Sequence, residues 1–126
     1  MPPAPTPPDD QPVPAVSLAD VDRVVRRDFP PDEVAGVLAT LEAYGRQSWH
    51  REVPRVRLAI LKQAQGDWKK LRRALATADK DYRDILSYAE YPAYFAAIQP
   101  DETNAAKRRS AIAADWRQYS SWLKKK

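Results

Sequence analysis

The sequence predicts an all-α protein, a compact bundle of about five helices that follows a disordered, proline-rich N-terminal tail. Three observations support this fold class. Apolar residues recur at spacings of three and four over most of the chain, as they do on one face of a helix. Prolines and glycines separate these periodic segments. No segment shows the apolar and polar alternation or the β-branched runs that are typical of strands.

The chain is expected to divide into a tail, residues 1–16, and a single helical domain, residues 17–126. Seven of the twelve prolines lie between Pro2 and Pro14, where they remove backbone donors and disfavour helical geometry. The tail has few apolar residues to offset the entropy lost on ordering. We therefore expect a solvated tail, which is more common for this composition than a proline-rich ligand segment.

The first two helices are expected over about residues 17–28 and 31–44. Ser17 is a candidate N-cap, with an aspartate three residues later that can complete a capping box. Two consecutive prolines end the first helix and are tolerated in the first turn of the second. Gly45 stands where a left-handed residue is expected to end the second helix.

A third helix is expected over about residues 55–65, and its apolar face is wide enough to be largely buried. The next segment has apolar residues at alternating steps of three and four, and we expect it to form one continuous rod over residues 68–89. Its seam consists of Trp68, Leu71, Leu75, Ala78, Tyr82, Ile85 and Ala89. Such a rod packs lengthwise against its neighbours and would be the central element of the bundle.

Pro92 is expected to end the rod, because proline disfavours helical geometry at the residue before it. A short helical turn over residues 93–98 then precedes a last helix over about residues 102–123. The inward side of this last helix is expected to carry Ala105, Ile112, Trp116, Tyr119 and Leu123.

Composition excludes several kinds of protein. With 44% hydrophobic and 30% charged residues, and no apolar run near the roughly 20 residues that span a bilayer, a transmembrane helix is not expected. The absence of cysteine excludes disulfides, thiol nucleophiles and thiolate metal sites. The N-terminal residues lack the basic and apolar regions of a secretory signal, so a cytoplasmic protein is expected.

No catalytic, cofactor or metal site is expected. His50 is the single histidine, and beside a tryptophan near a turn it is more typical of a surface or packing residue than of a general base, so His50→Ala is expected to be nearly silent. Asp79, Asp81 and Asp84 form an acidic cluster. The basic residues between them favour solvated ion pairs over a metal site, which normally needs more oxygen ligands.

Aromatic residues gather at the end of the expected rod, and we treat them as a candidate protein interface. They are Tyr82, Tyr88, Tyr91, Tyr94 and Phe95. One interpretation is that the tyrosine rings fill the junction where the rod ends, with their hydroxyl groups paired to nearby charged residues. The alternative is an exposed aromatic patch with a charged rim, a composition found at protein interfaces.

A candidate basic face follows the same rod opposite its apolar seam. It consists of Lys69, Lys70, Arg72, Arg73 and Lys80. Residues 46–126 carry eighteen basic and nine acidic side chains, whereas residues 1–45 carry three and eight. These opposite charges either pair within the domain or expose a basic face to an acidic partner. There is no glycine-rich phosphate loop and no recognisable helix-turn-helix spacing.

Three stretches, RVRLAILK at residues 55–62, GDWKKL at residues 66–71 and DYRDILSYAEYP at residues 81–92, carry a resemblance. The segment resembles a set of short uncharacterised bacterial proteins that share an RVxLAILK, GDxxxL and DYRDxLxxAEYP arrangement. The resemblance covers about a third of the chain. It implies a bacterial origin and a compact helical unit, and it carries over no activity and no site residues.

The sequence as a whole favours a non-enzymatic protein-interaction module, for example a bacterial adaptor or a toxin-neutralising protein. It would offer the tyrosine-rich end of the rod and the neighbouring basic residues to an acidic or aromatic protein partner. The alternative is a nucleic-acid-binding protein that uses the basic face of residues 67–90.

Overall fold

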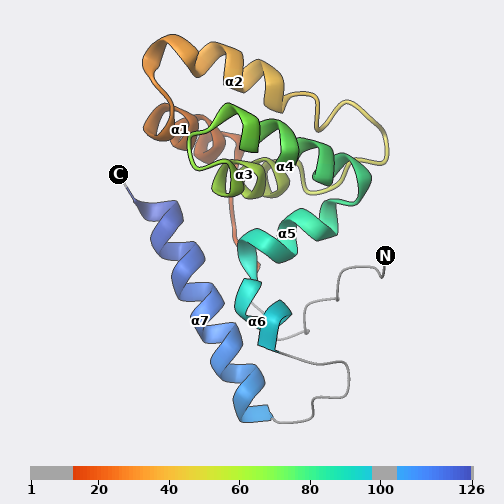
Figure 1. Ribbon diagram of the computed structural model, residues 1–126, viewed down its shortest axis with the longest axis vertical. Helices are drawn as coiled ribbons and strands as arrows, with labels where there is room; N and C mark the ends of the chain where they lie inside the picture. The colour runs from red at the N-terminus through yellow and green to blue at the C-terminus, as the bar shows by residue number, and fades with distance from the viewer. Residues whose placement is uncertain (1–12, 98–104, 126) are drawn as a thin grey trace.

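A computed structural model describes residues 13–97 and 105–125 of the chain. In these residues it contains seven α-helices, one 3-10 helix and no strand (Figure 1). The elements are α1 (Leu18–Asp28), η1 (Pro31–Glu33), α2 (Val34–Leu41), α3 (Val53–Ala64), α4 (Trp68–Lys80), α5 (Tyr82–Glu90), α6 (Pro92–Ala97) and α7 (Ala105–Lys124). The prediction of an all-α bundle is confirmed, with more helices than the five expected.

The first two helices begin as predicted. The backbone N–H of Ser17 donates to the Asp20 carboxylate over 2.9 Å, which is the reciprocal half of a capping box. Pro31 opens the short η1, and α2 continues from it. The α-helical part ends at Leu41, three residues earlier than expected, and turns carry the chain on to Gly45. Gly45 has a positive φ of 127°, but the prediction that it ends this helix is wrong, because Glu42 is the C-cap of α2.

The central element is α3 rather than the expected rod. Six of its twelve residues are buried, and the helix packs against α1, α4 and α5. The buried residues are Val56, Leu58, Ala59, Ile60, Leu61 and Ala64. Because these residues cover more than one face, α3 has to be surrounded by other helices. Figure 1 shows α1, α2 and α4 grouped with α3, while α6 and α7 lie to one side.

The prediction of one continuous rod is wrong, because the chain breaks at Asp81. This residue is extended, with φ −156° and ψ 108°, and separates α4 from α5. Its carboxylate accepts hydrogen bonds from the backbone N–H of Arg83 at 3.0 Å and from the Arg83 guanidinium at 2.8 Å. An N-capping aspartate favours this non-helical geometry over continued helix. The seam still faces inward on both pieces, since Leu71, Ala78, Ile85 and Ala89 are buried.

The last helix, α7, is attached to the rest of the protein near its middle and at its C-terminal end. Near its middle, the buried Asp115 carboxylate accepts the backbone N–H groups of Ala93 at 2.7 Å and Tyr94 at 2.9 Å, and so caps α6. At its C-terminal end, the Arg27 guanidinium of α1 donates to the carbonyls of Trp122 and Lys125, each over 2.7 Å. The Trp122 carbonyl also accepts the Lys125 backbone N–H over 3.3 Å, and α1 supplies further hydrogen bonds to the carbonyls at this end of the helix.

The predicted inward face of α7 is correct for Ile112 and Tyr119, which are buried. It is wrong for Trp116, which is 40% exposed. The partial packing of α7, which contacts mainly α6 and α5, leaves too little covered surface to bury the whole predicted stripe. The side chain of Ala105 and the first residues expected in this helix lie outside the described residues.

Most of the expected N-terminal tail, residues 1–12, also lies outside the described residues. Of the last four residues expected in it, Pro14 is buried and Val16 packs against the core. The packed part of the chain therefore begins before Ser17, the residue at which the helical domain was expected to start. None of the helices in the described ranges has the length and apolar character needed to cross a membrane.

The side chain of Leu71 is expected to contribute strongly to the stability of the core. Because its side chain is fully buried on α4, Leu71→Ala should lower the free energy of unfolding by about 2–5 kcal/mol, measured by urea denaturation. Leu18→Ala is the matched control, since Leu18 is 54% exposed and should cost much less. An equal effect of the two substitutions would contradict this core assignment.

Asp81 should contribute a pH-dependent part of the stability. The Arg83 guanidinium, with the Arg83 backbone N–H, holds the pKa of Asp81 below its usual range. This stabilisation is therefore present above about pH 4 and is lost as the pH falls through the lowered pKa. Asp81→Ala should cost about 1 kcal/mol at pH 7, as other cap removals do, and less at pH 3. Urea denaturation at both pH values measures the two costs, and equal costs would contradict this role.

Candidate functional site

The tyrosine cluster does not form one exposed patch. Tyr91 is buried, and burial raises its pKa to about 12. Tyr82 and Tyr94 are half-buried and pack against the core. Among the four tyrosines, Tyr88 is the most exposed, with 39% of its surface accessible. The side chain of Phe95 lies outside the described residues. Tyr91 therefore fits the interpretation that tyrosine rings fill the junction at the end of the expected rod. Tyr88 is the tyrosine of this cluster that reaches the surface.

A buried ion pair, rather than a tyrosine hydroxyl, satisfies Glu90 at the end of α5. The Arg55 guanidinium of α3 donates to both carboxylate oxygens, over 2.6 Å and 2.7 Å. Burial raises the pKa of Glu90, and the Arg55 cation opposes that shift. The pair ties the start of α3 to the end of α5, and such a bidentate arrangement is structural rather than catalytic because both partners are fully engaged.

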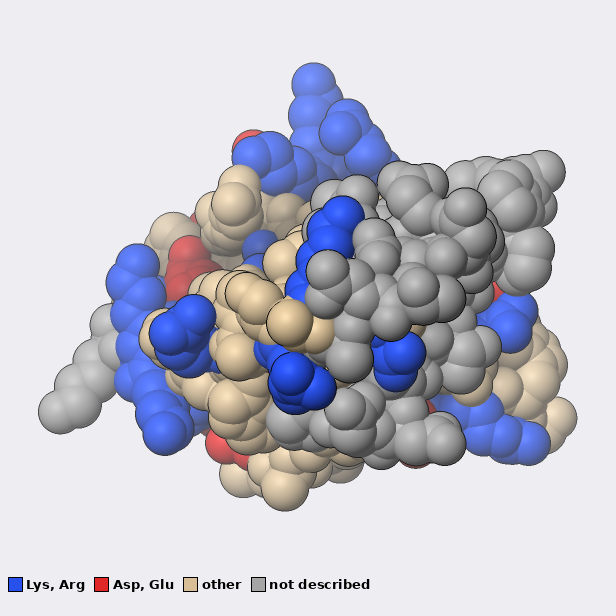
Figure 2. Space-filling view, turned by 90° about the horizontal axis from the view of Figure 1, so that it is seen from below, with Lys and Arg blue, Asp and Glu red and all other residues tan. Residues whose placement is uncertain are grey.

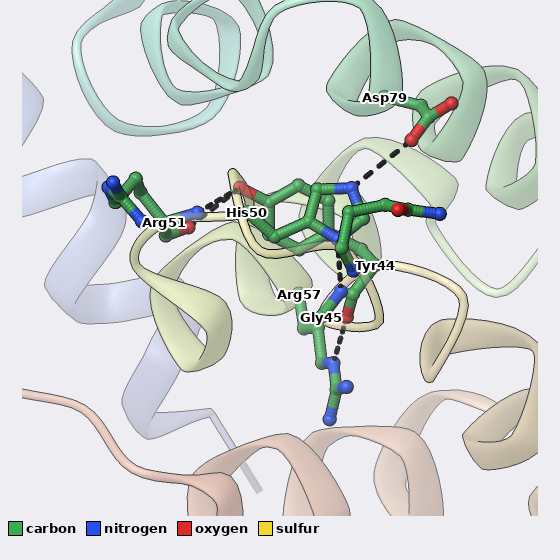
Figure 3. A network of polar contacts seen from close by, with 7 residues as sticks. Tyr44, Gly45, His50, Arg51, Arg57 and Asp79 are labelled. Carbon is green, nitrogen blue, oxygen red and sulfur yellow. Dashed lines mark hydrogen bonds and ion pairs between the residues drawn. The ribbon is translucent and has the colours of Figure 1, made fainter.

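His50 is buried in the segment between α2 and α3, at the centre of a polar network (Figure 3). Its Nδ1 atom accepts the backbone N–H groups of Gly45 at 2.8 Å and Gln47 at 3.2 Å. Nδ1 is therefore the unprotonated nitrogen, and Nε2 donates to the Asp79 carboxylate on α4 over 3.2 Å. Neither ring nitrogen remains available to act as a general base, so His50 organises this loop.

Tyr44 completes the same network. Its ring stacks on His50 with centroids 4.2 Å apart, and its hydroxyl donates to the Arg51 carbonyl over 2.6 Å. The Arg57 guanidinium of α3 donates to the Tyr44 carbonyl over 3.0 Å (Figure 3). These contacts fix the irregular segment that sequence periodicity left undefined.

The acidic cluster does not come together as a metal site. Asp79 binds His50, and Asp81 binds Arg83. Within the described residues no group of three potential ligands is placed to hold a metal ion. The partner of Asp81 therefore agrees with the preference for ion pairs over a metal site, whereas Asp79 accepts a hydrogen bond from the His50 ring.

The five cations of the predicted basic face are all exposed on α4, and we call them the α4 basic surface. They are Lys69, Lys70, Arg72, Arg73 and Lys80. Lys70 donates to the Gln65 side-chain oxygen over 3.0 Å, and the Arg72 guanidinium lies 5.5 Å from the Trp68 ring centroid. None of the five forms an ion pair with a carboxylate of the described residues. The Asp67 carboxylate interacts with Lys69 and Lys70 through longer-range electrostatics, so this surface carries positive charge that no carboxylate of the described residues binds directly.

Arginines elsewhere in the described chain contrast with this surface. Several are paired with carboxylates: Arg23 with Asp20, Arg26 with Asp22, Arg27 with Asp28, Arg55 with Glu90 and Arg83 with Asp81. The excess of positive charge is visible on other parts of the molecule as well. Figure 2 shows the molecule from below the view of Figure 1. On this face, Lys and Arg cover more of the described surface than Asp and Glu do.

A groove of about 430 Å³ runs along one flank of α4, and we call it the α4 groove. Leu75 and Ala76 provide apolar surface, while Arg46 and Arg72 bring positive charge and Asp79 lies at the end nearest His50. The sequence predicts Arg72 as part of the basic face but gives no signal for Arg46, because Arg46 lies in the irregular segment that only the folded chain places beside α4. The groove thus combines apolar and cationic surface within one depression.

Comparison with known proteins adds no constraint to this geometry. No protein family, curated protein or solved structure matches the chain. The resemblance to short bacterial proteins stays a prediction. Function is therefore argued from the residues of the chain itself.

The network around His50 predicts a stability effect where the sequence suggested none. His50→Ala removes the acceptor of two backbone N–H groups, so the free energy of unfolding should fall by about 1–3 kcal/mol in urea denaturation. His50→Asn, whose side-chain oxygen can replace Nδ1, should lose less. An unchanged unfolding midpoint for His50→Ala would instead support the expectation from sequence that this substitution is nearly silent.

Proposed function

We propose that this chain is a non-enzymatic protein-interaction module that binds an acidic segment of a partner protein through the α4 basic surface and the α4 groove. The observation that carries the proposal is the set of five exposed cations on α4, none paired with a carboxylate of the described residues. Exposed cations of this kind attract and orient a partner of opposite charge.

The α4 groove favours a protein partner over a nucleic acid. Its apolar residues Leu75 and Ala76 offer surface that an apolar side chain of a peptide can cover, and arginines such as Arg72 are enriched at protein interfaces. Asp79 lines the same groove and would repel a phosphate backbone, whereas a protein segment can present a complementary charge to it.

The burial of Tyr91 changes the surface on which this proposal rests. The tyrosine-rich end of the expected rod contributes Tyr88 at most, so the interface moves from the tyrosines to α4. A bacterial adaptor or a toxin-neutralising protein would be a module of this kind.

The proposal is tested by a pull-down from extracts of the source cell, with and without nuclease. The test variant is Lys69→Glu/Arg72→Glu, which reverses two charges near the start of α4 where glutamate is compatible with the helix dipole. The matched control is Arg109→Glu/Arg117→Glu, which makes the same change in net charge at exposed positions of α7. We expect a nuclease-resistant protein that the α4 variant loses and the α7 variant retains.

Other outcomes would overturn the proposal. Equal loss with both variants would indicate a response to net charge alone. Recovery that nuclease abolishes would favour the nucleic-acid alternative, in which neutralising about four phosphates gives a log–log salt slope near −3.6.

A further inference from the structure

A cleft lies on the flank of α4 opposite the α4 groove, and we call it the α3–α4 cleft. It has a volume of about 410 Å³ and is lined by the C-terminal end of α3, by α4 and by α5. Adjacent residues of α4 point to the two sites, since Arg72 lines the groove and Arg73 lines the cleft. Its volume falls in the range of small-molecule sites, roughly 300–1,000 Å³.

Three cations and no carboxylate line the α3–α4 cleft. They are Lys62 from α3, and Lys70 and Arg73 from α4. Lys62 is half-buried, and burial lowers its pKa although the Asp115 carboxylate opposes the shift. Asp115 is already bound to the N-terminus of α6. The Lys62 ammonium forms no hydrogen bond or ion pair with the described residues, so an anion in the cleft would stabilise it.

The donors suit a compact, doubly charged anion. Lys70 gives one of its three N–H groups to Gln65, which positions the ammonium at the cleft and leaves two donors for a ligand. Arg73 offers a planar guanidinium that matches phosphate oxygens in pairs. Lys62 adds a third positive charge from a different helix.

The rest of the lining combines the polar side chains of Gln63, Gln65 and Thr77 with apolar and aromatic surface, which an organic group on the ligand can contact. The buried residues Ala74 and Ile85 and the exposed ring of Tyr88 line the cleft together with the cations. We propose that the α3–α4 cleft binds a small phosphate monoester, with the phosphoryl group held by Lys62, Lys70 and Arg73 and the organic group against Tyr88 and Ile85. Such an ester carries a charge of about −1.5 to −2 at pH 7.

Calorimetric titration of the full chain with phenyl phosphate tests this site, with inorganic phosphate as the second probe. We expect one phenyl phosphate per chain, bound about tenfold more tightly than inorganic phosphate because the ring contacts apolar surface. Arg73→Gln should weaken phenyl phosphate binding about tenfold, the value of one charge-assisted hydrogen bond. The matched control is Arg72→Gln, one residue away on the opposite flank, which should change the affinity less than about twofold.

Each contrary result overturns the proposal. No heat with phenyl phosphate excludes the site, equal losses with Arg72→Gln and Arg73→Gln indicate a diffuse effect of helix charge, and equal affinity for inorganic phosphate excludes the monoester. Lys62→Gln provides a second variant should Arg73→Gln unfold, which circular dichroism would detect. The pull-down variant leaves the three cleft cations intact, so failure of this site and failure of the proposed partner surface remain distinguishable.

Discussion

The burial of α3 on several sides is the constraint on which the rest of the structure depends. Leu58, Ile60 and Leu61 are fully buried, so other helices must surround α3, and the polar side chains of the same helix have to leave the core near its ends. Arg55 finds Glu90. Lys62, near the other end, has no such partner among the described residues and lines the α3–α4 cleft.

Much of the fold could be predicted from periodicity, because periodicity reports which residues face the core. Four seam residues from Leu71 to Ala89 are buried as expected and two, Leu75 and Tyr82, are half-buried, although the rod that was expected to carry them is broken. A repeat of three and four constrains side-chain direction and does not constrain the axis, so two helices joined at Asp81 satisfy it as well as one. The break itself rests on local capping bonds to Arg83, which compete with helix at a single residue.

The candidate site was less predictable, because its features depend on contacts between distant segments. The exposure of the basic face followed from the helix period alone, whereas the burial of Tyr91 and the position of Arg46 depend on tertiary packing. His50 illustrates the same limit. Its role comes from Gly45, five residues earlier, and from Asp79 on another helix, and neither spacing is a recognisable motif.

The cations of α4 are not explained by the stability of the fold. Lys69 and Arg73 are four residues apart on one helix face, and like charges at this spacing destabilise a helix by about 0.2–0.5 kcal/mol per pair. The helix does not need them, since Asp67 caps its N-terminus through the Lys70 backbone N–H and the apolar seam anchors its inner side. Lys69 and Arg73, which repel each other and form no ion pair with a carboxylate of the described residues, are therefore the cations whose presence the proposed binding roles would explain.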